Sequence, residues 1–159
     1  MFWSFSEPLT QRDRQQRLTY LAIALAPLIG SVLYNLGFRL PFLKGCPFLR
    51  YTGIPCPGWG MTRSFMAIAR GDWQQALNYH LLAPLVFAGF LMATIHLLVE
   101  LFCNQKIHTA YGAIARSPKA QTLAFLVLLG YHSTRLYTLA QSGELLVSFM
   151  QSPLGLWLN

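Results

Sequence analysis

The residues best able to do chemistry are two cysteines, Cys46 and Cys56, which lie close together in a segment rich in glycine and proline. Two thiols at this spacing could form a structural disulfide or pack as free, buried thiols. They could also exchange a disulfide, or bind a metal ion with His80, although a fourth metal ligand is not evident. A disulfide between Cys46 and Cys56 is the leading hypothesis, and we predict no metal site.

Three arginines make a second set, because a guanidinium fork suits phosphate or carboxylate. Arg63, Arg70 and Arg135 could converge with Trp59 on an anionic ligand. Arg135 lies inside an apolar stretch, where a cation is costly and ordinarily faces a protein interior or a cavity. Arg135 could therefore brace the neighbouring loop or bind a ligand. The alternative for Arg63 is an interfacial arginine bonded to loop carbonyls and lipid phosphate.

The sequence gives little support for acid–base or nucleophilic catalysis. The chain has only five acidic residues, and it carries no Ser-His-Asp set, phosphate-binding P-loop, His-Glu-x-x-His motif or paired carboxylates. His96 and Glu100 share one helical face and could bind a pigment, a haem or a proton, but a polar contact between helices is the simpler interpretation. We predict no catalytic residue and assign no cofactor.

The composition indicates a membrane protein. Of 159 residues, 54% are apolar and 11% are charged, whereas an ordinary soluble domain has roughly 25% charged residues. The net charge of +7 comes from cations that flank apolar runs and do not form a basic face. This pattern argues against nucleic-acid binding and favours contact with anionic lipid headgroups.

The elements that must position these residues are helices. About 20 apolar residues cross the hydrocarbon core as a helix, and three stretches qualify, at residues 18–38, 81–103 and 120–140. We predict an all-α integral membrane fold, with residues 1–159 forming one membrane domain of three transmembrane helices. Three arginines precede the first span, which favours a cytoplasmic N-terminus.

The loop at residues 39–80 carries the candidate chemistry. Its Gly-Pro run at residues 53–60 requires turns. Met61, Phe65 and Ile68 then share one face of a short helix predicted over residues 62–69, which would lie at the interface or re-enter the membrane. Asp72 is predicted to cap a following helix, which continues through His80 into the second span.

These residues resemble a family of small bacterial multi-pass membrane proteins known only as a domain of unknown function. The family signature is Cys-Pro-x-Cys-Gly-x-Thr-Arg followed by a Gly-Asp pair. This chain carries Cys56-Pro57-Gly58-Trp59-Gly60-Met61-Thr62-Arg63 and Gly71-Asp72. Arg135 also resembles an arginine that members carry near the end of a later span. Trp59 replaces the second cysteine, so this motif cannot form the dithiol that its usual form would allow. Forms with tryptophan here look like those of photosynthetic bacteria.

The resemblance implies a bacterial inner (plasma) membrane or thylakoid membrane location, but no activity. Our leading hypothesis is a non-enzymatic accessory subunit or assembly factor, with the lipid bilayer and a membrane protein or a second copy of the chain as partners. The alternative is a binding module or enzyme acting on an anionic lipid or isoprenoid headgroup. A thiol-redox protein is a third hypothesis, which Trp59 argues against.

Overall fold

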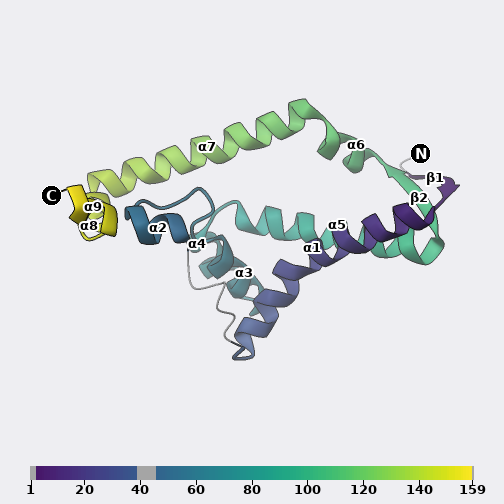
Figure 1. The fold of residues 1–159 in the computed structure, drawn as a ribbon, viewed down its shortest axis with the longest axis horizontal. Coiled ribbons are helices and arrows are strands. Elements are labelled where there is room, and N and C mark those ends of the chain that lie inside the picture. Colours follow the sequence, from purple (N-terminus) through teal and green to yellow (C-terminus); the bar gives the residue numbers. More distant parts are fainter. Residues whose placement is uncertain (1–2, 39–45, 159) are drawn as a thin grey trace. The chain divides into compact units, whose positions relative to one another are not determined.

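A computed structural model describes residues 3–38 and 46–158 (Figure 1). The described chain is mostly helical and forms two compact units. The first unit comprises Met1–Leu40 with Gly60–Ala115, and the second comprises Pro41–Trp59 with Arg116–Asn159. The start of the predicted motif loop, residues 39–45, lies outside the described residues.

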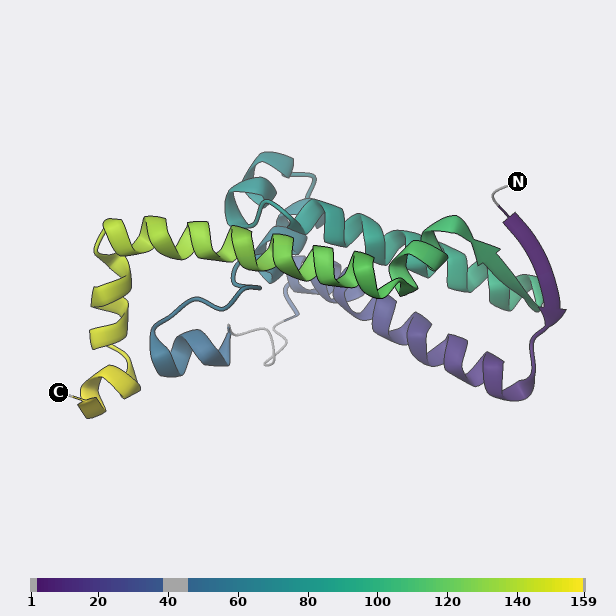
Figure 2. The same ribbon diagram turned by 90° about the horizontal axis from the view of Figure 1, so that it is seen from above.

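Two long helices, α1 (Gln11–Asn35) and α5 (Ala83–Cys103), dominate the first unit and run alongside each other (Figure 2). Thr10 begins α1 with a capping box, in which its hydroxyl accepts from the Asp13 amide and the Asp13 carboxylate accepts from the Thr10 amide. The buried residues of α1 are Ala24, Leu28 and Ser31, whose spacing places them on one face. A Cβ at Gly30 or Gly89 would meet nothing within 4 Å, so neither glycine is needed for the packing of α1 on α5.

The short helix predicted after the Gly-Pro run is confirmed as α3 (Met61–Ala69). Its apolar face packs in a core with α4 (Trp73–Tyr79) and α5, where the Phe65 ring meets Phe87 edge-on at 5.2 Å between centroids. Asp72 caps α4 as predicted, by accepting from the Gln75 amide at 2.9 Å. These contacts fix α3 and α4 as a compact platform beside the two long helices.

The prediction that α4 continues into the second span is wrong. Residue His80 adopts an extended conformation, with φ −161° and ψ 112°, which ends α4. A turn follows, and α5 begins at Ala83 with a proline in its first turn, where a missing N–H is tolerated. His80 is fully buried at this corner.

The all-α prediction also missed a two-stranded antiparallel sheet. Strand β1 (Trp3–Pro8) pairs with β2 (Gln105–Thr109), so that Trp3 lies opposite Thr109 and Phe5 opposite Ile107. The pairing is irregular between Phe5 and Pro8. It joins the segment before α1 to the segment after α5, and β2 leads into α6 (Ala110–Arg116).

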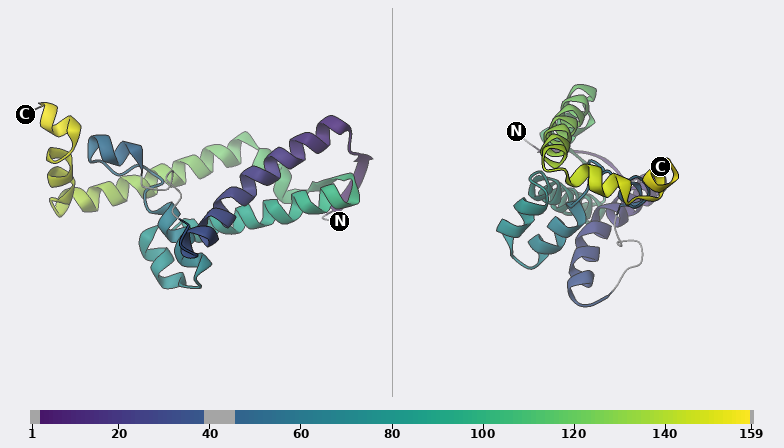
Figure 3. Two further views of the ribbon diagram at one scale, coloured as in Figure 1. Left: turned by 60° about the horizontal axis from the view of Figure 1, so that its bottom comes forward. Right: turned by 90° about the vertical axis from the view of Figure 1, so that its left-hand side faces the viewer.

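The second unit contains α2 (Pro47–Thr52), α7 (Pro118–Gln141), α8 (Glu144–Met150) and α9 (Pro153–Leu158). Gly143 allows α7 to turn sharply into α8, as Figure 3 shows. Gly53 ends α2 at φ +70°, and a Cβ there would collide with the backbone carbonyl of Ser148 in α8. Glycine is therefore required twice over at position 53, by its backbone conformation and by this close approach.

Among the described residues, two helices, α1 and α5, are long and apolar enough to cross a membrane. The helix that contains most of the first predicted span runs from Gln11 to Asn35. The third predicted stretch is helical as α7, but its polar C-terminal half lowers its hydropathy, and it does not meet the same criteria.

Candidate functional site

Trp59 and Arg135, two predicted ligand-binding residues, contact each other within the second unit. The Arg135 guanidinium donates to the Trp59 backbone carbonyl at 2.8 Å, and its carbon lies 4.3 Å from the centre of a Trp59 ring. One guanidinium therefore holds both the backbone and the ring of Trp59, near the end of the Gly-Pro run. A hydrogen bond from a charged donor contributes about 1.5–3 kcal/mol, and a cation–π contact about 0.5–2 kcal/mol. This arrangement is the bracing alternative for Arg135.

The Gly-Pro run itself forms turns, as its composition predicts. The Trp59 amide donates to the Cys56 carbonyl at 2.9 Å, which closes a turn over Pro57 and Gly58. At the other end of the run, the Ile54 amide donates to the Thr52 hydroxyl at 3.1 Å. Residues 53–60 thus connect α2 to the Arg135 contact without regular secondary structure.

Cys46 and Cys56 lie in the same unit, near enough for each thiol to shift the pKa of the other. Both are half-buried free thiols, so the predicted disulfide stays a prediction. Cys46 is the residue that precedes α2. Burial opposes its ionisation, but hydrogen bonds from Cys56 and from the backbone at Leu49 and Phe48 outweigh it and lower the pKa of Cys46.

The pKa of Cys56 shifts the other way. Burial and the hydrogen bond to Cys46 raise the pKa of Cys56 above its usual value. Their spacing predicted that the two thiols would interact, but the sequence analysis did not predict α2, the helix that lies between them.

Arg70 is used inside the first unit. Its guanidinium donates to the side-chain oxygens of Asn35 and Gln75, each at 3.1 Å. Asn35 in turn donates to the Met66 carbonyl at 2.9 Å, so the end of α1 is tied to both α3 and α4. Asn35 was missed because its partners are distant in sequence and it forms no recognisable motif with them.

Arg63 is the remaining arginine of the predicted site. It lies in the first turn of α3, its side chain is exposed, and among the described residues it has no hydrogen bond or ion pair. Arg63 and Arg70 belong to the first unit and Arg135 to the second. Convergence of the three on one anion stays a prediction.

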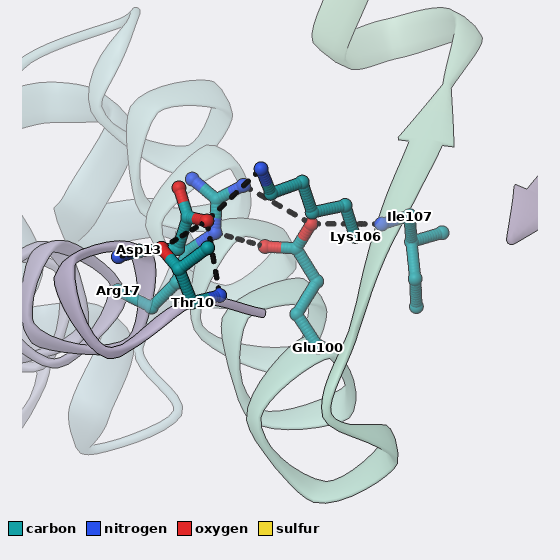
Figure 4. A network of polar contacts seen from close by, with 6 residues as sticks. All are labelled: Thr10, Asp13, Arg17, Glu100, Lys106 and Ile107. Carbon is teal, nitrogen blue, oxygen red and sulfur yellow. Dashed lines mark hydrogen bonds and ion pairs between the residues drawn. The ribbon is translucent and has the colours of Figure 1, made fainter. Parts of the chain in front are cut away.

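A polar network fastens α1, α5 and β2 (Figure 4). The Glu100 side chain is only 2% exposed, and its carboxylate pairs with Arg17 at 2.6 Å and accepts from the Ile107 amide at 2.9 Å. His96 lies 3.6 Å from the same carboxylate. Glu100 thus makes a polar contact between helices, the simpler interpretation drawn from the sequence.

The outer part of this network is an ion pair between Lys106 and Asp13 at 2.9 Å. Asp13 also accepts from Thr10 as part of the α1 capping box. Arg17, one of the three arginines that precede the first predicted span, and Lys106 therefore tie separate elements of the first unit together. Within the described ranges, no group of three or more His, Cys, Asp and Glu residues could hold a metal ion.

Comparison with known proteins identifies the central segment. Residues 46–94 match a family model described as a protein of unknown function, DUF2752. The match confirms the resemblance to a domain of unknown function and covers both cysteines, Trp59, Arg63 and Arg70. No curated protein and no solved structure matches the chain.

Proposed function

We propose that this chain is a non-enzymatic accessory subunit or assembly factor of a bacterial membrane protein complex, and that α7 is a third transmembrane helix through which it docks. The proposal is carried by the character of α7. This helix has 24 residues and none of them is buried. At about 1.5 Å per residue it is long enough for a hydrocarbon core of roughly 30 Å.

The exposed surface of α7 is suited to another helix. Gly130, Thr134 and Thr138 follow one another at four-residue spacing and are all exposed. Small residues at this spacing let helix backbones approach closely in lipid, and hydroxyl groups add hydrogen bonds between helices. A Cβ at Gly130 would meet nothing within 4 Å, so no described part of the chain packs closely against the ridge at this position.

The hydrogen bonds of Arg70 and Arg135 also support a non-enzymatic role. Arg70 and Arg135 are engaged by side chains and backbone of their own units. Neither guanidinium needs an external anion to satisfy it. The polar groups expected at a ligand site therefore serve the fold, and the exposed α7 ridge becomes the better candidate for interaction.

The test is a pull-down from native membranes. The chain is tagged, extracted in mild detergent and compared with a Gly130→Leu variant, which fills the ridge, and with a Phe125→Leu control elsewhere on α7. We expect a stoichiometric membrane protein, or a second copy of the chain, with the wild type and the control but not with Gly130→Leu. A chain that is a lone, stable particle in native membranes would refute the proposal.

A second candidate function is binding of an anionic lipid or isoprenoid headgroup, and the exposed, unengaged Arg63 favours it. Its test is binding of the purified chain to vesicles with and without anionic lipid. Replacement of Arg63 with Ala should reduce this binding, whereas an Arg50→Ala control, an arginine of the second unit, should not. Equal loss in both variants would indicate general electrostatic attraction instead.

A further inference from the structure

Helices α2, α8 and α9 of the second unit pack into one small body, the α2–α8–α9 cluster. Gly53 ends α2 against the backbone of Ser148 in α8, where a Cβ would not fit. Gly155 in α9 lies as tightly against the Phe149 carbonyl of α8. The Ser152 hydroxyl joins these two helices, because it donates to the Phe149 carbonyl at 2.6 Å and accepts from the Gly155 amide at 3.1 Å. These contacts fix the three short helices relative to one another.

The polarity of this cluster is the reverse of what water favours. Ser152, a polar residue, is 4% exposed, whereas Trp157 is 81% exposed. Along α8, Leu146 and Met150 lie four positions apart on one exposed, apolar face. Large exposed apolar surfaces mark sites of contact with a membrane or with another protein. The other exposed apolar and aromatic side chains of the cluster include Phe48, Tyr51, Val147, Leu154, Leu156 and Leu158.

Three observations favour the bilayer over a protein as the partner of this surface. Residues 145–158 contain no charged side chain, and charges are what select one protein partner against others. Tryptophan and tyrosine, which the cluster exposes on α9 and α2, prefer the headgroup depth of a membrane. Helix α8 also leaves the end of α7 at a sharp angle (Figure 2), as a chain does when it turns from a span into the membrane surface.

We propose that the α2–α8–α9 cluster lies in the headgroup layer of the bilayer and sets the depth of the C-terminal end of α7. Its aliphatic side chains enter the upper part of the acyl chains, while Tyr51 and Trp157 stay at headgroup depth. Glu144 stands two positions before Leu146 and therefore on the opposite side of α8, which leaves its carboxylate toward water. This inference rests on the proposed span of α7, which brings the cluster to the membrane surface.

The experiment measures the depth of Trp157 in nanodiscs of neutral phosphatidylcholine, because insertion driven by apolar burial needs no anionic lipid. Trp3, Trp59 and Trp73 are replaced with Phe, which leaves Trp157 as the only tryptophan. The lipid carries bromine, which quenches tryptophan fluorescence on contact, either near the headgroup or near the methyl end of the acyl chains. We expect the shallow bromines to quench Trp157 several-fold more strongly than the deep ones.

Two results would overturn the proposal. If neither lipid quenches Trp157 and an aqueous quencher reaches it, the cluster stands in water and its surface is left for a protein partner. If the deep bromines quench Trp157 more strongly than the shallow ones, α9 lies in the hydrocarbon core and not in the headgroup layer.

A second probe separates this inference from the proposed function. Leu129→Trp, combined with replacement of all four native tryptophans by Phe, puts one tryptophan near the middle of α7. The deep bromines should quench it most strongly if α7 crosses the membrane. Deep quenching at position 129 with Trp157 in water would refute the inference alone, whereas shallow quenching of Trp157 without deep quenching at position 129 would refute the span of α7.

A simpler comparison serves if the chain with three Phe replacements does not fold. The wild type is measured beside Trp157→Phe, a change at an exposed position that should leave the fold intact. The difference between the two chains in quenching by the shallow bromines is then the signal of Trp157. Equal quenching of the two chains would overturn the proposal.

Discussion

The Glu100 network offers the sharpest test of how the long helices are held together. Replacing Glu100 with Ala removes the acceptor of the buried Ile107 amide and the partner of Arg17. An unsatisfied buried amide costs about 1–3 kcal/mol. Arg17 is 25% exposed and can regain water, which limits the cost of the lost ion pair. We expect a loss of about 3 kcal/mol in the free energy of unfolding.

Two further variants separate the charge from the hydrogen bond. Glu100→Gln keeps an oxygen for the Ile107 amide and should cost only about 1 kcal/mol. Arg17→Ala leaves the buried Glu100 carboxylate without its cation. Removal of one partner of a buried ion pair costs about 3–5 kcal/mol. Because water can reach this site, we expect Arg17→Ala to lower the free energy of unfolding by about 2–3 kcal/mol.

The assay is reversible unfolding in mixed micelles, followed by far-ultraviolet circular dichroism. The matched control is Glu144→Ala, since Glu144 is exposed at the start of α8 and should change stability by no more than about 0.5 kcal/mol. The reasoning is refuted if Glu100→Ala unfolds together with the control, or if Glu100→Gln costs as much as Glu100→Ala.

The remaining predictions concern the second unit and its place in the membrane. Arg135→Ala should destabilise the chain by about 2 kcal/mol, because it removes the hydrogen bond to the Trp59 carbonyl and the contact with the Trp59 ring. Arg135→Lys should recover part of this loss, because lysine can keep one of the two contacts but not both. Equal unfolding midpoints for Arg135→Ala and the wild type would contradict the bracing role of Arg135. Gly53→Ala should cost more than the roughly 1–2 kcal/mol of a left-handed residue, because its Cβ also meets the Ser148 carbonyl. Gly143 has φ +76° and open space around its Cβ, so Gly143→Ala should cost only the left-handed backbone conformation. Equal losses of thermal stability in Gly53→Ala and Gly143→Ala would contradict the collision with Ser148. If α1, α5 and α7 all cross the membrane, the two termini lie on opposite sides, so a protease added on one side should remove only one of two terminal tags. Removal of both tags from the same side would leave only α1 and α5 as spans.

Local patterns in the sequence were enough to predict the platform of the first unit. The spacing of Met61, Phe65 and Ile68 predicted the apolar face of α3, and Asp72 predicted the start of α4. Both signals lie within one or two helical turns, where periodicity and capping act. The break at His80 was missed because nothing next to it in sequence forbids a helix, although Pro84 marks the start of the next one.

The sheet and the Arg135 contact depend on residues far apart in the chain. Strand β1 pairs with β2, although all the helices from α1 to α5 lie between the two strands in the sequence. Residues 105–109 have no distinctive strand pattern of their own. Arg135 and Trp59 are 76 positions apart, so the sequence could predict that Arg135 needs a partner but not which one.

The docking role of α7 is tested most directly by photo-crosslinking in native membranes. A photoreactive amino acid is placed at Thr134, on the small-residue ridge, or at Phe125, which is nine positions away and therefore about half a turn around the helix. Both positions are exposed in the chain. We predict a discrete protein adduct from position 134 and lipid adducts from position 125. Lipid adducts alone from both positions would contradict the proposal that α7 docks this chain onto a protein partner.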